Sequence, residues 1–384
     1  MSARRKRVGL DGSTRGGRDQ GETTTPRGAG LIGWLSAMVG SGTGIRGRLE
    51  HPFRRESRRL TILLLTAVAG RAETHRYTPT AGVPTFAVRA PVLRLQPGDV
   101  VESHTFSKPG DYYEKAGGPW PGEVGPFFIE GLTPEDTLVV KIVRLRPNRN
   151  TAVSAVVPMG ISAVAGDTRT RILNDPLPAR RFVWQIDRAR NVGILDLPNS
   201  ASKRIELPLK PMLGRVAVAP AGQEAWGGLW PGNFGGNMDA SDVREGATVY
   251  LPVFHEGGYF YFGDAHALQG DGEIVGSGLE TTMDVTLQFD VIKGRTTAWP
   301  RIEDESHIMV AGSVRPLVDA FRIAHVELIQ WLVDDYGFDK MEAYQVVSQA
   351  GVSRVANVVD PNYTVVAKFP KSALPARVPR TPSR

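Results

Sequence analysis

The sequence predicts an α+β protein that is mainly β, built from sandwich or barrel units with a C-terminal pair of helices. Short apolar runs between residues 83 and 151 recur between Pro and Gly turns, and Met283–Ile292 alternates apolar with polar residues. After residue 316 the apolar residues change to helical spacing. We therefore expect strands through most of the chain and helices near its end.

Composition divides the 384-residue chain into four parts. Residues 1–53 are rich in Gly, Arg, Ser and Thr without periodicity, which predicts a disordered leader. Residues 54–72 join a basic start, an apolar run and small residues, as in a signal peptide for export to the periplasm or the medium. Ser57–Arg59 resembles a twin-arginine signal. The alternative is a hydrophobic strand behind a basic linker in a cytoplasmic protein. The rest is expected to form two β-rich domains, 73–222 and 223–384, the second with the helix pair.

The positive charge is confined to the start of the chain. Residues 1–72 carry 14 Lys and Arg against 5 Asp and Glu, whereas the rest of the chain is slightly acidic. We therefore expect no nucleic-acid partner, and no membrane partner once the signal is removed. The chain has no cysteine, which excludes cysteine nucleophiles, cysteine-bound zinc and disulfides.

The same Pro and Gly turns between apolar runs predict individual strands. Phe127–Glu130 and Thr137–Leu145 are expected to form a pair joined across Leu132–Asp136. Met283–Ile292 is expected to be a strand that ends at the turn Lys293-Gly294. These segments place the expected β structure both before and after residues 230–280.

Two helices are predicted near the end of the chain. The apolar positions of the first are Leu317, Phe321, Ala324, Leu328 and Leu332. Gly337 is its expected end, and Asp339 with Glu342 forms an acidic variant of the capping box before a second helix closed by Gly351.

The stretch between residues 230 and 280 gathers polar side chains on a glycine-rich backbone. Asp264 and His266 lie two residues apart on an expected strand, which places both on one face. Asp271 and Glu273 repeat this spacing after a glycine. Carboxylate together with imidazole suits a zinc-type ion. Alternatively, Asp and Gly only mark hairpin turns, and His266 is a buried residue with satisfied hydrogen bonds.

Several ordered motifs resemble the acetamidase/formamidase family. They are Gly125–Gly131, Asp136–Leu138, Asn233–Asp239, Leu251–Phe254, Gly263–Glu273 and the helical region around Ala343-Tyr344. The resemblance covers residues 84 to 370, and it implies a small linear amide such as formamide or acetamide as substrate, and a homo-oligomer. The family usually carries an Asp just after the strand at Glu102–His104, where this chain has Thr105 or Phe106.

The composition limits which catalytic groups could hydrolyse an amide in this chain. Amides are poor electrophiles, so a hydrolase without cysteine needs a serine–lysine system or a metal that activates water, and the chain has no Gly-Ser-Ser motif. We expect a divalent metal ion, zinc with calcium as the alternative, held by Asp264, His266 and His104. Glu273 or Glu280 is expected to act as base and as proton donor to ammonia.

The expected substrate-binding residues are Asn237, Gln269 and Asp239. Two other functions stay open from sequence alone. One is hydrolysis of a small cyclic amide, a lactam. The other is a non-catalytic β-rich module that binds metal or carbohydrate, in which Asp264, Asp271 and Glu273 hold calcium. His266 favours the catalytic metal site, because calcium prefers oxygen ligands.

Overall fold

The computed structural model describes residues 72–156, 163 and 178–378. The predicted leader at 1–53 and all but the last residue of the predicted signal at 54–72 therefore lie outside the described residues. Within the described part of the chain, no helix is long and apolar enough to span a bilayer.

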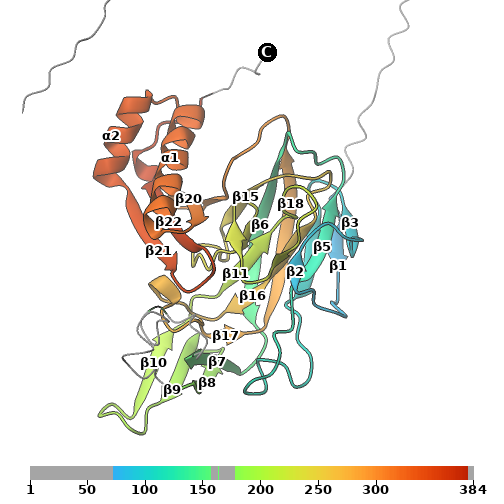
Figure 1. Ribbon diagram of the computed structural model, residues 1–384, viewed down its shortest axis with the longest axis vertical. Helices are drawn as coiled ribbons and strands as arrows, with labels where there is room; N and C mark the ends of the chain where they lie inside the picture. The colour runs from blue at the N-terminus through green and yellow to red at the C-terminus, as the bar shows by residue number, and fades with distance from the viewer. Residues whose placement is uncertain (1–71, 157–162, 164–177, 379–384) are drawn as a thin grey trace, which may run out of the picture. The chain divides into compact units, whose positions relative to one another are not determined.

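One sheet has nine strands, which come from both halves of the chain (Figure 1). In sheet order they are β1 (Thr74–Arg76), β4 (Val100–His104), β18 (Met283–Ile292), β6 (Thr137–Pro147), β15 (Thr248–Pro252), β19 (Arg301–Glu303), β20 (His307–Val314), β22 (Tyr363–Pro370) and β21 (Val352–Asn357). The alternating segment predicted at 283–292 is β18. It pairs antiparallel with β4 on one side and β6 on the other.

The second sheet has eleven strands. Its main path is β10 (Arg204–Pro208), β9 (Val192–Asp196), β8 (Arg180–Asp187), β7 (Thr151–Val156), β17 (Glu280–Thr281), β16 (Phe260–His266), β11 (Met212–Ala217), β14 (Gly235–Asn237) and β13 (Pro231–Gly232). The remaining two are β3 (Leu93–Leu95) and β5 (Val124–Ile129), and β5 joins them to β16. A separate short pair is formed by β2 (Thr85–Phe86) and β12 (Trp226–Gly227).

The two sheets share one apolar core. Val140 and Leu287 contribute to it from the nine-stranded sheet, and Leu213 and Phe262 from the eleven-stranded sheet. The predicted α+β, mainly β fold is confirmed, with open sheets instead of closed barrels. Each sheet combines strands from before and after residue 222, so the sheets do not follow the predicted division into 73–222 and 223–384.

The expected pairing of 127–130 with 137–145 is wrong. The first segment belongs to β5, which pairs with β16 and with β3, whereas β6 pairs with β15 and β18 in the other sheet. All six residues of β5 are buried. A strand buried on both faces is covered by other structure on each side, and the turn at 132–136 carries the chain from one sheet to the other.

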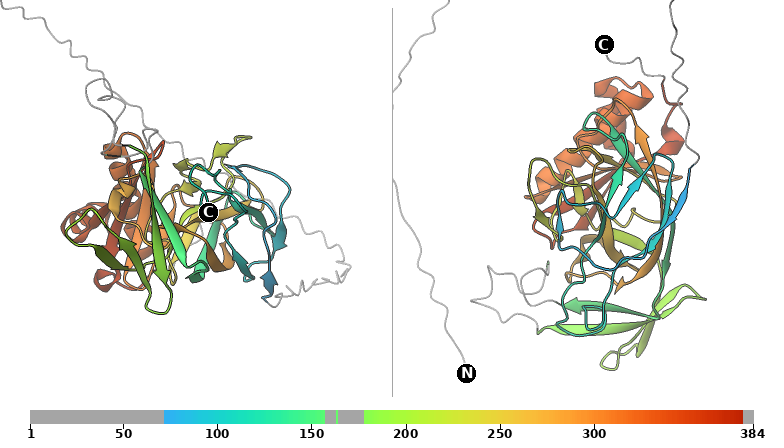
Figure 2. Two further views of the ribbon diagram at one scale, coloured as in Figure 1. Left: turned by 90° about the horizontal axis from the view of Figure 1, so that it is seen from below. Right: turned by 90° about the vertical axis from the view of Figure 1, so that its right-hand side faces the viewer.

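Helix α1 (Leu317–Tyr336) and helix α2 (Lys340–Ala350) confirm the predicted pair, and they contact β20 and β22 (Figures 1 and 2). Gly337 ends α1 with a left-handed φ of 71°, and the Asp339 side chain accepts hydrogen bonds from the first backbone N–H groups of α2. Ala324 and Leu328 are buried in a second core against the sheet. Phe321, expected in the same stripe, is 45% exposed.

The eleven-stranded sheet also includes the green strands β7 to β10, which lie at the opposite end of the molecule's described part from the two helices (Figures 1 and 2). Two short 3₁₀ helices, Asp271–Glu273 and Lys371–Ala373, complete the described elements. The first of them follows β16 directly and carries Glu273.

Candidate functional site

The end of β16 and the short strand β17 bring three predicted residues together. β16 carries Asp264 and His266, and β17 carries Glu280 directly opposite His266. Asp264 has a φ of 55°, an unusual backbone conformation for a residue other than glycine. All three side chains are buried. Asp264 and His266 thus reach the same site, as their spacing predicted.

The His266 imidazole has one nitrogen fixed by a neighbouring amide. The Gln269 Nε2 group donates to the carbonyl oxygens of Asp239 and Ala356, at 2.7 and 3.1 Å. Because carbonyl oxygens only accept, these two bonds fix which end of the amide is the NH₂ group. Gln269 Oε1 must then accept from His266 Nδ1, 2.8 Å away. His266 therefore carries a proton on Nδ1.

The other ring nitrogen faces two carboxylates. His266 Nε2 lies 3.2 Å from Asp264 Oδ1 and 3.1 Å from Glu280 Oε2. Three electron-pair donors at this spacing need a positive charge among them, either a proton on Nε2 or a bound cation. Ligands on a tetrahedral zinc ion with bonds of about 2.0 Å lie about 3.3 Å from one another. The arrangement therefore suits a cation of that size.

Burial and neighbouring charges shift the pKa values of the three groups differently. Burial opposes a charge on His266, but Glu280 and Asp264 raise its pKa well above the ordinary value. Burial alone would raise the pKa of Asp264, yet Arg215 and His266 outweigh it and hold the pKa at about 2. Burial raises the pKa of Glu280 despite His266. Asp264 is therefore the permanent anion of the cluster.

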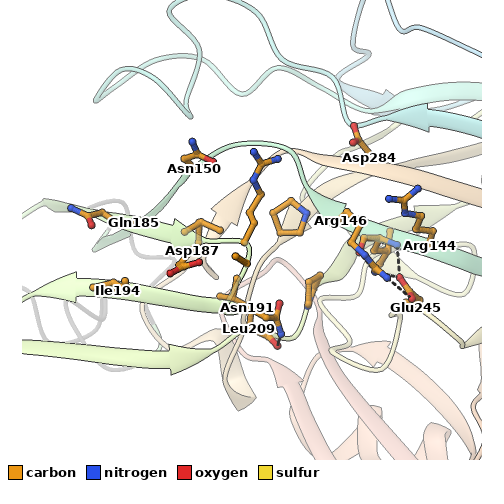
Figure 3. A pocket seen from close by; sticks show the side chains of 16 residues that line it. Arg144, Arg146, Asn150, Gln185, Asp187, Asn191, Ile194, Leu209, Glu245 and Asp284 are labelled. Carbon is orange, nitrogen blue, oxygen red and sulfur yellow. Dashed lines mark hydrogen bonds and ion pairs between the residues drawn. The ribbon is translucent and has the colours of Figure 1, made fainter.

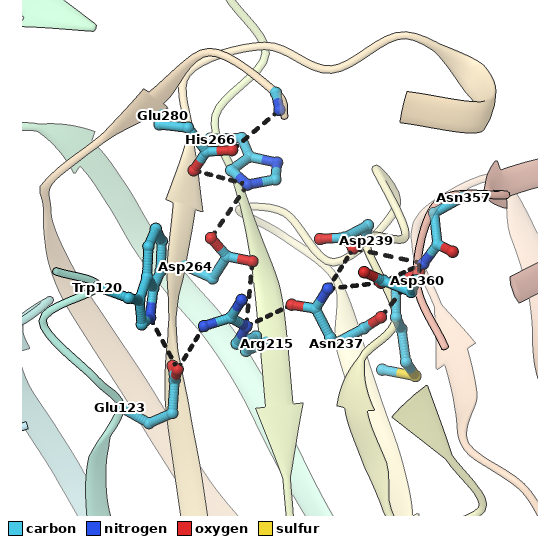
Figure 4. A network of polar contacts seen from close by, with 12 residues as sticks. Trp120, Glu123, Arg215, Asn237, Asp239, Asp264, His266, Glu280, Asn357 and Asp360 are labelled. Carbon is cyan, nitrogen blue, oxygen red and sulfur yellow. Dashed lines mark hydrogen bonds and ion pairs between the residues drawn. The ribbon is translucent and has the colours of Figure 1, made fainter. Parts of the chain in front are cut away.

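A buried arginine keeps Asp264 ionised (Figure 4). Arg215 on β11 lies with Nε 3.3 Å from Asp264 Oδ2, and its Nη1 donates to Glu123 Oε1 at 2.6 Å. Its Nε also donates to Asn237 Oδ1. The Trp120 ring lies 4.5 Å from the guanidinium carbon and donates from Nε1 to Glu123. The guanidinium thus ties three strands of the sheet to the cluster.

A second group of acids lies beside the first (Figure 4). Asn237 Nδ2 donates to Asp239 Oδ2 at 2.7 Å and to Asp360 Oδ2 at 2.5 Å. Asn357 Nδ2 contacts the same two oxygens at 3.3 and 3.0 Å. Asp239 and Glu273 can each place an oxygen within 4.8 Å of a His266 ring nitrogen. His266 is therefore shared by two possible ligand groups.

The pKa values of the acids in this second group are raised. Burial raises the pKa of Asp239 well above its usual range, and Asp360 raises it further. Burial, then Asp239, does the same for the pKa of Glu273. Burial and Glu273 raise the pKa of Asp360 to about 8. Strongly perturbed carboxyl groups gathered in one place are typical of functional sites.

Glycine makes room for these side chains. A methyl group at Gly214 would lie 2.4 Å from Asp239 Oδ1 and 2.7 Å from Asp264 Oδ2. One at Gly278 would lie 2.5 Å from His266 Nδ1. Both distances are far below van der Waals contact, so any larger residue would displace the cluster.

A cavity of about 510 Å³ opens onto both groups. Its lining includes Asp264, Glu273 and Glu280 together with Tyr112 and Trp120. This volume is in the range of small-molecule sites. The cavity therefore gives a substrate access to the perturbed carboxyl groups.

A larger hollow of about 1340 Å³ lies between β6 and the loop after β8 (Figure 3). Two of its carboxylates pair with arginine, Glu245 with Arg146 and Asp187 with Arg190, and the third, Asp284, accepts from Asn148 Nδ2 at 2.9 Å. Neither ligand group found among the described residues borders it. We therefore place the candidate site in the smaller cavity.

The structure does not bring every predicted residue to this site. His104 on β4 belongs to the nine-stranded sheet, contacts the carbonyl oxygen of Thr105 through Nδ1, and is in neither ligand group. Asp271 pairs with Arg354 at the surface, so the calcium ligand set with Asp264 and Glu273 is not assembled. The amides of Asn237 and Gln269, expected to bind substrate, are occupied by protein groups.

Sequence reasoning missed Arg215, Glu123 and Asp360. Arg215 is a lone charge in the apolar run of β11, and Glu123 stands directly before the buried strand β5. A charged residue inside a buried strand needs a partner, which is the signal that could have identified Arg215. Asp360 follows β21 in an ordinary turn sequence and gives no such signal.

The residues present fit a divalent metal ion. His266 Nε2 and oxygens of Asp264 and Glu280 converge within 4.8 Å, and so do atoms of Asp239, His266 and Glu273. The buried Asp239 Oδ1 accepts no hydrogen bond from the residues that the structure describes. Buried oxygens without donors are costly unless a cation or ligand meets them.

Comparisons with known proteins relate this chain to one family of enzymes. The model of the Acetamidase/Formamidase family matches residues 197–375. Among solved structures, the chain is similar to an acetamidase from Yersinia enterocolitica, with 35% identity and a TM-score of 0.70 over 80% of this chain and 94% of that chain. It is also similar to an acetamidase from Bacillus halodurans, with 28% identity and a TM-score of 0.67 over 77% of this chain and 97% of that chain.

A curated acetamidase from Mycolicibacterium smegmatis is 35% identical over 88 residues, which are 23% of this chain and 21% of that relative. The match thus spans about a fifth of the curated relative's length. The similarity to the Yersinia structure, by contrast, extends over nearly the whole of that chain. The chain therefore belongs to the acetamidase/formamidase family.

Proposed function

We propose that the protein hydrolyses amides, releasing ammonia and a carboxylate. The observation that carries this proposal is the convergence of His266 Nε2 with Asp264 and Glu280, two acids that border an accessible cavity. The same stretch carries the family motifs Asn233–Asp239 and Gly263–Glu273. Relatives with this fold are named acetamidases, which supports an amide as the substrate.

We also propose that the cluster binds a divalent ion, with zinc favoured over calcium because an imidazole nitrogen is among the donors. Asp264, His266 and Glu280 are the residues that would hold it, with Asp239 and Glu273 as further donors beside them. Such an ion would supply Lewis-acid chemistry, lowering the pKa of water and polarising a carbonyl group.

The remaining roles belong to the chain's own residues. Arg215 keeps Asp264 anionic, and Gln269 fixes the tautomer that presents His266 Nε2 to the site. Glu273 lines the cavity, where a carboxylate oxygen can take a proton from the attacking water and pass it to the leaving nitrogen. The Tyr112 side chain also lines the cavity, and burial raises its pKa, so its hydroxyl stays protonated and can donate to the substrate.

Ammonia release tests this proposal directly. The purified full chain is assayed on linear amides and on one lactam, before and after treatment with a chelator and after zinc is restored. Lactam turnover is followed by the amino acid that forms, because ring opening releases no ammonia. We expect turnover of linear amides that the chelator abolishes and zinc restores. Turnover of the lactam alone would move the activity to cyclic amides, and no ammonia from any amide would overturn the proposal.

Export and self-association remain predictions from the sequence. The proposed signal lies outside the described residues, and a homo-oligomer follows only from the family resemblance. Size-exclusion chromatography with light scattering measures the second, and the mature N-terminus of protein recovered from the exporting host measures the first.

A further inference from the structure

The cavity at the candidate site is much larger than the smallest amides. It is partly open to solvent and has a volume of about 510 Å³, whereas one water molecule takes about 30 Å³ of liquid volume. Acetamide has only four non-hydrogen atoms, so it would leave most of this space to water. Sites of about 300–1,000 Å³ typically enclose ligands of drug size.

The lining combines two kinds of residue. The acids that would act on the amide, Asp264, Glu273 and Glu280, are buried and border the cavity. Apolar and aromatic residues border the same cavity: Pro84, Tyr112, Trp120, Pro121, Leu229 and Val359. A substrate that reaches the acids with its amide group therefore has apolar side chains nearby for its acyl group.

One member of this apolar lining is a large apolar side chain on an exposed loop. Leu229 is 47% exposed and borders the cavity, on the loop between β12 and β13. The lining also contains the Tyr112 and Trp120 rings, whose centroids lie 5.6 Å apart. An apolar group bound against these side chains would be removed from water, which is favourable in proportion to the area buried.

Resting on the amidase function proposed above, we propose that the preferred substrates are amides with an apolar acyl group, from four carbons to a phenylacetyl group, in place of formamide or acetamide. Leu229 is then a specificity-determining residue, since it contacts the acyl group and takes no part in the chemistry. Lys108 also borders the cavity, so an acyl group ending in a carboxylate is the competing possibility for the test to separate.

The experiment compares kcat/KM for ammonia release across formamide, acetamide, butyramide, hexanamide, phenylacetamide and succinamate. We expect a rise of about fourfold for each methylene that becomes buried, so that hexanamide and phenylacetamide exceed acetamide by at least about tenfold. A fall from acetamide to hexanamide, or a preference for succinamate, would overturn the proposed acyl preference while leaving the amidase function in place. No ammonia from any of the six would overturn both.

A variant pair locates the preference. Leu229→Ala should lower kcat/KM for hexanamide by about tenfold and lower that for acetamide much less, so that the ratio of the two values falls. Ile205→Ala is the matched control, because Ile205 is a 38% exposed apolar residue on β10 that does not border the cavity. Circular dichroism confirms that both variants are folded. Equal loss on hexanamide and acetamide in the folded Leu229 variant would show that this residue does not select the acyl group.

Discussion

Buried carboxyl groups in two regions of this protein have pKa values that are shifted in opposite directions. Asp136, in the turn between β5 and β6, accepts hydrogen bonds at 2.6 to 2.9 Å from Thr133, Lys293 and Gly294. Burial would raise its pKa, but these donors lower it to about 2. In the cavity, burial and neighbouring acids raise the pKa of Asp239 and Glu273 instead.

The difference lies in the donors that the chain supplies. Both oxygens of Asp136 are met by protein groups, so its charge stabilises the fold. Asp239 keeps one oxygen without a donor among the described residues, which destabilises the fold unless a cation or substrate binds. Asp136 and Asp239 both belong to family motifs, so the structure distinguishes a carboxylate with donors from one that lacks a donor on one oxygen, which the motifs do not.

The sharpest way to break this comparison is Glu273→Gln. We expect kcat/KM for amide hydrolysis to fall by at least about 100-fold, because a carboxamide cannot carry the proton. The free energy of unfolding should stay unchanged or increase, since a group with a strongly raised pKa gains little from its charge. Urea denaturation measures the second quantity. A variant that loses both activity and stability would place Glu273 with Asp136 as a structural residue.

Gln269→Ala tests whether the tautomer of His266 matters. The change removes the acceptor of the Nδ1 proton, and we expect a loss of about 10–100-fold in metal affinity or activity. Gln269→Glu keeps an acceptor for Nδ1 but loses both donors to backbone carbonyls. Metal titration monitored by calorimetry compares the two variants, and wild-type affinity in the alanine variant would contradict the assigned role.

Asp136→Asn should show the opposite behaviour to Glu273→Gln. A pKa lowered from 3.8 to about 2 corresponds to roughly 2 kcal/mol of stability from the charged form. Because the folded pKa is depressed, this stability is fully present above pH 4 and is lost as the pH falls toward 2. We expect the variant to be less stable than the wild type at pH 7, with normal amide turnover.

Denaturation curves at pH 7 and near pH 2 check this expectation. The difference between wild type and Asp136→Asn should shrink at the lower pH. A difference that is independent of pH would mean that the charge of Asp136 contributes nothing and that only packing is lost.

The smallest effect is expected for Asp271, two residues from Glu273. Its pair with Arg354 is half exposed, and such pairs contribute about 0–1 kcal/mol. Asp271→Asn should therefore change neither unfolding nor kcat/KM measurably. A large loss of activity would place Asp271 in the site despite its outward position.

The sequence was most informative where its patterns were strong and local. The strand at Met283–Ile292 and the helix that begins at Leu317 were predicted because alternation and helical spacing each persist over many residues. The family motifs located Asp264 and His266, and the spacing of two placed them on one face. These features depend on neighbours in the chain.

The rest of the site depends on which strands become neighbours. Arg215 pairs with Glu123 and is linked to Asp360 through Asn237, although these residues come from distant segments. No local pattern indicates that β11 lies beside both β16 and β14. His104 was expected as a ligand because of its residue type, but its strand joins the other sheet. Gln269 was expected to bind substrate, but in the structure both ends of its amide bind protein groups.

The central claim is that His266 Nε2, Asp264 and Glu280 form a cation site, and metal content tests it most directly. His266→Gln keeps the volume and a hydrogen-bonding group at the position while weakening coordination. Inductively coupled plasma mass spectrometry of the wild type should give about one divalent ion per chain, and the variant should lose most of it while retaining the β circular-dichroism signal. Full metal content and near-native amide turnover in the variant would contradict the claim, and His266 would then be only a buried histidine with satisfied hydrogen bonds.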